Sequence, residues 1–174
     1  MGVKIVGIDP GYATVGCGAV EFSKGAFRAL AYGAIETPAS EEFPRRLLQI
    51  DDELRELLER IRPQAVAVEK LYFNTNTTTA IDVAQARGVI VACAAKQGIP
   101  IFEYTPLQVK LAVVGYGRAE KMQVMEMTRM ILGLEKLPRP DDVADALAIA
   151  ICHAHTAASG IGRATLQNGK EIQR

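Results

Sequence analysis

The sequence predicts an α/β fold with a five-stranded mixed sheet flanked by helices. Three apolar runs near the N-terminus are separated only by short turns, which is the pattern of an antiparallel meander. Two later apolar runs each follow a segment of helical periodicity, so we expect them to join the sheet as parallel strands. The chain has 174 residues, 49% of them hydrophobic and 23% charged, which suits one globular domain, expected over residues 1–158.

The three N-terminal strands are expected at residues 3–9, 14–21 and 27–35. A Pro-Gly turn separates the first two, and a second glycine-containing turn precedes the third. Gly16 and Gly18 in the second strand leave room for another backbone to approach closely.

A helical period begins after Pro44, where apolar residues recur every three or four positions and charged residues fill the opposite face. Pro63 ends this helix, and a fourth strand is expected at residues 65–69. A polar loop over 74–79 then leads into a helix over 80–96.

The remaining elements follow in the same alternation. A fifth strand is expected at residues 99–104, and Thr105 is placed as the N-cap of a short helix. Two further helices are expected over 120–132 and 141–157. The segment 159–174 is polar and without pattern, so we expect it to be a mobile tail.

Acidic side chains end or open three of these elements. Asp9 ends the first strand and Glu69 ends the fourth, while Asp142 and Asp145 lie at the start of the last helix, on one face of it. Carboxylates brought together repel one another unless a cation joins them, and oxygen ligands without His or Cys favour magnesium or manganese over zinc. Two such ions can support phosphodiester hydrolysis, so these four acids predict a metal site.

Each acid also has an ordinary structural explanation. Asp142 and Asp145 lie where a helix dipole favours negative charge, and Asp9 precedes a turn in which Asp is common. Glu69 is harder to explain in this way, because an unpaired Glu at the end of a Val-Ala-Val strand is costly to bury. The metal site is favoured because it accounts for all four acids together.

The composition excludes several classes of protein. No apolar run approaches the roughly 20 residues that span a bilayer, and no secretory signal is apparent, so no membrane association is expected. The three cysteines form no CxxC pair, which indicates buried thiols in a reducing compartment and a cytoplasmic location. The formal net charge is zero, so binding to a nucleic acid must depend on a local basic patch.

A modest basic surplus lies between the fifth strand and the last helix, and it includes Lys110, Arg118 and Lys121. These residues suit a phosphate-binding patch, although exposed lysines are ordinarily solvated charges. Tyr72 and Phe73 precede the polar loop, and they are either core residues or exposed rings that stack on bases.

The motifs of this chain resemble those of the RuvC family of bacterial Holliday-junction resolvases, within the RNase H-like (retroviral integrase) superfamily. The resemblance covers about residues 3–157 and follows five motifs in order. They are Gly7-Ile8-Asp9-Pro10-Gly11, Val68-Glu69-Lys70-Leu71, Gln85-Ala86-Arg87-Gly88, Gln108-Val109-Lys110 with Ala119-Glu120-Lys121, and the run from Asp142 to Ala150. One such motif would be weak evidence, whereas five at the family's spacing are specific.

The resemblance implies an RNase H-like fold and a role for individual residues. The four acids would hold two Mg²⁺ ions, with Mn²⁺ as a substitute, and Lys110 and Lys121 would contact the phosphate backbone near the cut. An aromatic ring, of Tyr72 or Phe73, would insert at the branch point of the junction. Asp141, next to the acids, is expected to be the helix N-cap.

The resemblance also implies a structure-selective DNA endonuclease of homologous recombination and DNA repair. It would resolve Holliday junctions by paired symmetric nicks through two-metal-ion hydrolysis, which leaves 5′-phosphate and 3′-hydroxyl ends. Paired nicks in a nearly two-fold symmetric four-way junction require a homodimer, and the helix over 80–96 is the candidate dimer surface. The RuvA–RuvB branch-migration complex is the expected partner.

Three other hypotheses remain open at this point. An actin- or hexokinase-type ATPase also places an acid after its first strand, but it needs two such domains. A non-enzymatic junction-binding subunit would gain nothing from four acids beside DNA phosphates. A related nuclease acting on RNA or on hybrid duplexes differs only in its substrate.

Overall fold

The computed structural model describes residues 2–70 and 79–158, and its five strands form one mixed sheet. The strand order is β3-β2-β1-β4-β5, with β1 antiparallel to β2, β2 antiparallel to β3, and β1, β4 and β5 parallel. The bounds are β1 Val3–Asp9, β2 Thr14–Ser23, β3 Ala26–Glu36, β4 Ala65–Glu69 and β5 Ile101–Tyr104. The predicted α/β fold and the direction of every strand are therefore confirmed. The expected mobile tail at 159–174 lies outside the described residues.

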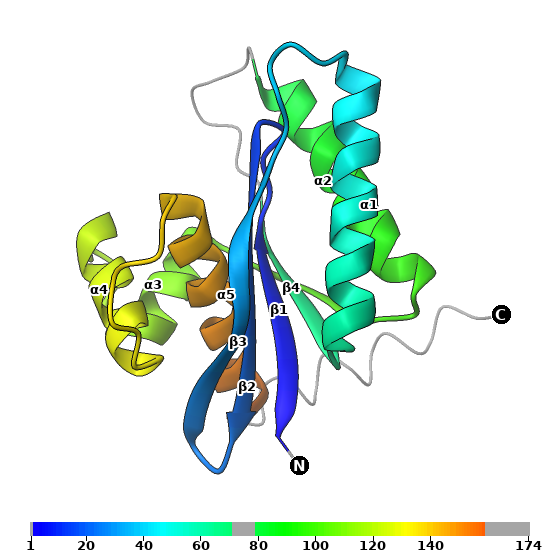
Figure 1. Cartoon of the computed structure of the whole chain (residues 1–174). Helices are drawn as coiled ribbons and strands as arrows, with labels where there is room; N and C mark the ends of the chain where they lie inside the picture. The colour runs from blue at the N-terminus through cyan, green and yellow to red at the C-terminus, as the bar shows by residue number, and fades with distance from the viewer. Residues whose placement is uncertain (1, 71–78, 159–174) are drawn as a thin grey trace, which may run out of the picture.

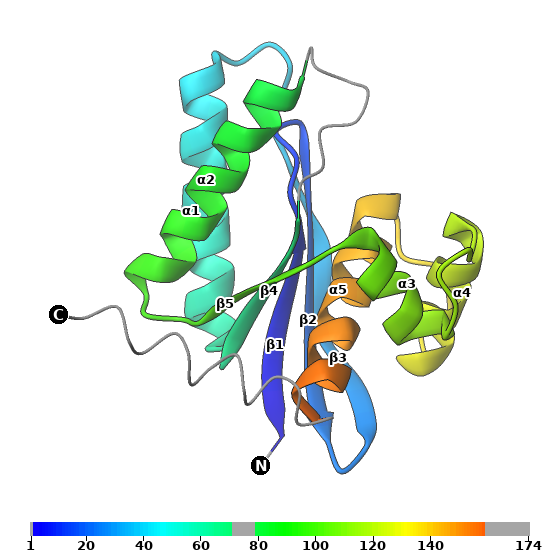
Figure 2. The ribbon, with the colours of Figure 1, turned by 180° about the vertical axis from the view of Figure 1, so that it is seen from behind.

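Helices cover both faces of the sheet (Figures 1 and 2). One face carries α1 and α2, and the other carries α5, with α3 and α4 packed against it. The bounds are α1 Phe43–Ile61, α2 Ala80–Lys96, α3 Pro106–Val114, α4 Lys121–Ile131 and α5 Asp141–Ala158. In the described part of the chain, no helix is long and apolar enough to span a membrane.

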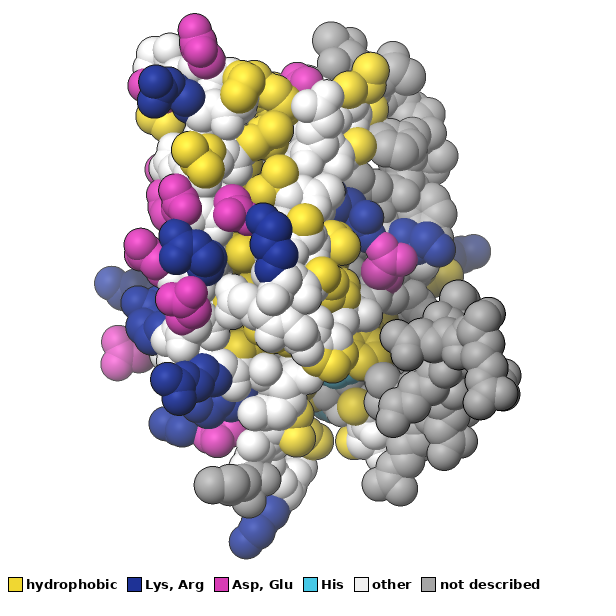
Figure 3. All heavy atoms as spheres, turned by 90° about the vertical axis from the view of Figure 1, so that its right-hand side faces the viewer, with side chains coloured by type: hydrophobic (Ala, Val, Ile, Leu, Met, Phe, Trp, Pro, Cys, Tyr) yellow, Lys and Arg dark blue, Asp and Glu magenta, His cyan; other side chains and the backbone are white. Residues whose placement is uncertain are grey.

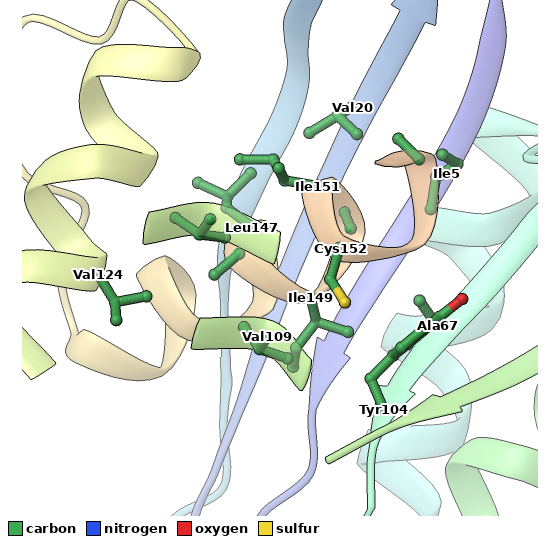
Figure 4. Packing of buried hydrophobic residues seen from close by; sticks show 14 of the residues in the cluster. Ile5, Val20, Ala67, Tyr104, Val109, Val124, Leu147, Ile149, Ile151 and Cys152 are labelled. Atoms are coloured by element: carbon green, nitrogen blue, oxygen red, sulfur yellow. The ribbon is translucent and has the colours of Figure 1, made fainter. Parts of the chain in front are cut away.

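Side chains along each strand alternate between the two faces of the sheet, and a hydrophobic core lies on each face. In β1, Val6 and Ile8 point to the α1–α2 face, whereas Ile5 points to the α5 face. Figure 4 shows Ile5 and Ala67 on the sheet in one cluster with Leu147, Ile149 and Cys152 of α5. Side chains alternate between the two faces of a strand. Residues two or four positions after Ile5 in β1, and two positions after Ala67 in β4, therefore also face α5.

Several predicted helix and strand ends differ from the structure by one or two residues, and two of the differences have a physical reason. The fifth strand begins at Ile101 and not at residue 99, because Pro100 has no N–H to donate and contributes only its carbonyl, to Val66 N at 2.9 Å. Asp141 was predicted as an N-cap but is the first residue of α5, and its carboxylate pairs with Arg139.

The predicted N-cap of α3 is confirmed. Thr105 Oγ1 accepts a hydrogen bond from Gln108 N at 3.1 Å, and Gln108 Oε1 accepts one from Thr105 N at 2.8 Å. This capping box begins α3 directly after β5.

Glycines allow α5 to lie directly on the sheet. A Cβ atom at Gly7 would come within 2.0 Å of the Ala146 carbonyl oxygen, and one at Gly16 within 2.0 Å of the Asp142 carbonyl oxygen. The nearest atoms belong to backbone, which cannot rotate away as a side chain can. The helix therefore approaches β1 and β2 as closely as two backbones permit, as the glycines of the second strand predict.

We expect Gly7→Ala to destabilise the fold by about 2–3 kcal/mol, because overpacking against a fixed backbone forces α5 away from the sheet. Urea unfolding followed by circular dichroism measures this free energy. Gly33→Ala is the matched control, since nothing lies within 4 Å of a Cβ atom there. Equal stability of the two variants would contradict the close approach of α5.

Candidate active site

Asp9 and Glu69 lie next to each other at the ends of two parallel strands. The pairing of β1 with β4 places Ile8 opposite Val68, so the following residues are neighbours at the carboxyl edge of the sheet. Asp9 lies two positions after Gly7, which touches α5, and Glu69 lies two positions after Ala67, which packs in the same core. Both carboxylates therefore face α5.

The start of α5 adds the other two acids. Asp9 pairs with Gly16 across β1 and β2, and Gly16 lies against the backbone of Asp142. Asp145 lies one helical turn further along the same face of α5. The structure thus brings together the four acids that were predicted as one site, from β1, β4 and α5.

The pKa values of these carboxyl groups reflect their crowding and burial. Burial, and then the charges of Glu69, Asp145 and Asp142, raise the pKa of Asp9 to about 8. Burial and then Asp145 raise the pKa of Glu69 above its usual range. Three neighbouring acids thus act on Asp9, and their repulsion favours binding of either protons or cations at this site.

Lys121 provides a positive charge inside the acidic site. Its Nζ lies 3.1 Å from Asp145 Oδ2 and 3.6 Å from Asp141 Oδ2. Burial lowers the pKa of Lys121, but the hydrogen bond to Asp145 and the neighbouring negative charges raise it overall. Lys121, predicted as a DNA contact, therefore pairs with the acids of the site in this structure.

The donor set matches a hard divalent cation in its chemistry. It consists of carboxylate oxygens without nitrogen or sulfur, which favours Mg²⁺ or Mn²⁺. Within residues 2–70 and 79–158, however, no three Asp, Glu, His or Cys side chains lie close enough to bind one ion together.

The other predicted contact residues form no ion pair with the acids or lie outside the described residues. Lys110 is partly buried on α3 and Arg118 is exposed in the turn after it. Neither forms an ion pair in the described part of the chain, so both charges are free to meet a phosphate. Tyr72 and Phe73 fall outside the described residues.

Sequence reasoning missed one buried charged residue close to the site. Arg46 is only 9% exposed and donates to the Tyr12 carbonyl oxygen, three residues after Asp9. A signal was present in the sequence, because Arg46 lies four residues before Ile50 on the buried stripe of α1.

The raised pKa of Asp9 predicts a pH-dependent stability. The folded chain keeps a proton on Asp9 up to about pH 8, whereas the unfolded chain loses it near 3.8, so unfolding releases a proton between these values. Stability contributed by this group is therefore fully present below about pH 4 and is lost as the pH rises towards 8. Asn resembles the protonated acid, so in EDTA the Tm advantage of Asp9→Asn over the natural chain should grow between pH 5 and pH 8. A constant difference would show that Asp9 is not perturbed.

Known proteins of one description are similar to this chain over most of its length. Residues 5–153 match the family model described as crossover junction endodeoxyribonuclease RuvC. Proteins of that description are 58% identical over 154 residues in Syntrophomonas wolfei (88% of this chain, 90% of the relative) and 59% identical over 150 residues in Moorella thermoacetica (86% and 90%).

Two solved structures extend the similarity to the whole fold. The Thermus thermophilus RuvC structure has a TM-score of 0.85 and 40% identity, and the match covers 91% of this chain and 97% of that one. The T. thermophilus RuvC in complex with Holliday junction substrate has a TM-score of 0.84 and 37% identity, with the same coverage.

Proposed function

Because the chain belongs to the RuvC family of crossover junction endodeoxyribonucleases, we propose that its four clustered acids are the catalytic centre with which it resolves Holliday junctions. The observation that carries this proposal is the meeting of carboxylates from β1, β4 and α5 on one face of the sheet. The acids are Asp9, Glu69, Asp142 and Asp145. A subunit that only binds DNA would not benefit from such a group beside phosphates.

The four acids would hold the Mg²⁺ ions, and Mn²⁺ would substitute. When bound, the ions would polarise the phosphodiester and lower the pKa of water. The carboxyl groups must lose their protons to serve as ligands. Because its pKa is high, Asp9 is the acid whose deprotonation costs most near neutral pH. Hydrolysis in this arrangement would leave 5′-phosphate and 3′-hydroxyl ends.

Three basic residues would position the DNA. Lys121, which lies at the acids, and Lys110 would contact the phosphate backbone near the cut, and Arg118 would add a further phosphate contact. Such contacts read the shape of the backbone and carry little base sequence, which suits selection of a four-way junction. Insertion of Tyr72 or Phe73 at the branch point remains a prediction.

A homodimer would place two such sites across the junction, and α2 is our proposed interface. The helix is apolar on both of its faces, although only one face packs on the chain's own core. Hydrophobic side chains run along this side of the molecule beside the charged side chains of α1 (Figure 3). Outward-facing residues at helical spacing are Ile81, Ala84, Gly88, Ala92 and Ala95.

Gly88 supports this interface most directly. A glycine in the middle of a helix costs about 1 kcal/mol relative to alanine. A Cβ atom at Gly88 would meet nothing within 4 Å, so no packing inside the described chain explains the glycine. A second helix crossing closely at this point would explain it.

A substrate panel tests the proposed activity. Labelled four-way junction, linear duplex and RNA–DNA hybrid are incubated with the chain in Mg²⁺, in Mn²⁺ and in EDTA. The proposal expects cutting of the junction alone, in either metal. Cutting of the hybrid in preference would favour the related nuclease acting on RNA.

A cytoplasmic role in recombination and repair, with the RuvA–RuvB complex as partner, is part of the proposal.

A further inference from the structure

Arg46 is a buried cation whose partners are a hydroxyl group, two backbone carbonyl groups and an aromatic ring. It lies on α1, and it forms no ion pair among the residues that the structure describes. Its Nε donates to Thr37 Oγ1 at 2.8 Å, and its Nη2 approaches the Tyr12 and Thr37 carbonyl oxygens at 3.4 Å. The guanidinium carbon also lies 4.7 Å from the centre of the Tyr12 ring.

These contacts converge on the turn that follows Asp9. Thr37 Oγ1 donates to the Tyr12 carbonyl oxygen at 2.5 Å, and Thr37 N donates to the Ala13 carbonyl oxygen at 3.0 Å. The turn between β1 and β2 is thereby tied to the end of β3 and, through Arg46, to α1. Without these ties, the turn would be held only by the strands at its two ends.

Packing alone does not explain an arginine at this position. The buried stripe of α1 is otherwise apolar, and burying a cation without a carboxylate partner is costly. A methionine would fill similar space at less cost, but it could not hold two carbonyl groups in a fixed direction. The planar guanidinium does so with its fork of donors.

The hydrogen bonds of Arg46 go to Thr37 and to the backbone of the turn. The cation that lowers the pKa of Asp9 is Lys121. The effect of Arg46 on the site therefore passes through the backbone of the turn.

We propose that Arg46 is a positioning residue of the active site, which fixes the turn after Asp9 and so directs the Asp9 carboxylate towards Glu69 and Asp142. The inference rests on the proposed function of these acids. A displacement of about 1 Å in a reacting group can lower a rate roughly 100-fold. Loss of the Arg46 contacts should therefore slow cleavage without lowering the affinity of the protein for the junction.

The test compares Arg46→Met and Arg46→Lys with the natural chain at a temperature at which all are folded. We expect kcat for junction cleavage to fall roughly 10- to 100-fold in Arg46→Met and less in Arg46→Lys, which keeps one donor. Junction affinity in EDTA should stay within about twofold of the natural chain, because Arg46 is buried. Mn²⁺ affinity, measured by electron paramagnetic resonance, should weaken several-fold.

Two controls separate positioning from charge and from stability. Arg45→Met removes the same charge from the exposed neighbouring residue, and Leu58→Ala destabilises the far end of α1. Both should keep the natural kcat. An unchanged kcat or an unchanged Mn²⁺ affinity in both Arg46 variants would overturn the proposal, as would an equal loss of kcat in Leu58→Ala. If the natural chain itself does not cut, the proposed function fails, and Mn²⁺ affinity still reports on Arg46.

Discussion

Asp9→Asn is expected to abolish junction cleavage while the variant still binds the junction. The substitution removes a proposed metal ligand from the site but keeps the shape of the side chain. Metal ions contribute several kcal/mol of charge stabilisation to such reactions, so a loss of roughly 1,000-fold or more in rate is expected. Single-turnover cleavage of a labelled four-way junction in Mg²⁺ measures it, and a gel-shift assay in EDTA measures binding.

The control for this prediction is another Asp→Asn change away from the site. Asp52 is exposed on α1 and pairs with Arg55 at 2.9 Å, so Asp52→Asn should cut at the natural rate. Cleavage by Asp9→Asn within tenfold of the natural rate would remove Asp9 from the catalytic centre. Loss of junction binding in the same variant would instead make Asp9 a structural residue.

Gly88→Glu is expected to convert a dimer into a monomer that no longer makes paired nicks. The change places charge and bulk in the middle of the proposed α2 interface, where nothing in the described chain obstructs the new side chain. A buried charge without a partner costs about 3–5 kcal/mol, which weakens association by roughly 100- to 4,000-fold. Light scattering measures the mass, and a plasmid-borne junction reports whether both strands are cut in one binding event.

Helix propensity makes this variant a sharp test, because replacing an exposed helical glycine should leave the monomer as stable as before or slightly more so. Gly33→Glu, at an equally open position on the edge strand β3, is the matched control and should stay dimeric. A Gly88→Glu chain that remains dimeric and cuts both strands would move the interface away from α2.

Much of the fold could be predicted because alternation and helical period are local properties of the sequence. The strand ends at Asp9 and Glu69 were predictable from a buried run followed by a carboxylate. That the two meet depends on the parallel pairing of β1 with β4, which the intervening helix implies. The glycines at 16 and 18 similarly indicated a close backbone contact, and the structure identifies α5 as the partner.

Other features could not be predicted, because they depend on tertiary contacts. The sequence presents Lys121 as one exposed lysine among several, and only the packing of α4 against α5 brings it to Asp145. In the sequence, Arg45 and Arg46 are adjacent residues of the same type, so nothing local tells them apart. Their difference follows from the rotation of α1, which exposes the first and buries the second against the turn after Asp9.

The most direct test of the central claim is a map of the cuts that the natural chain makes in a labelled four-way junction. The account predicts two nicks, placed symmetrically in strands of like polarity, that appear with Mg²⁺ or Mn²⁺ and not in EDTA. DNA ligase should seal them, because they carry 5′-phosphate and 3′-hydroxyl ends. Junction binding without any cut, in both metals and across several flanking sequences, would contradict the catalytic role of the four acids.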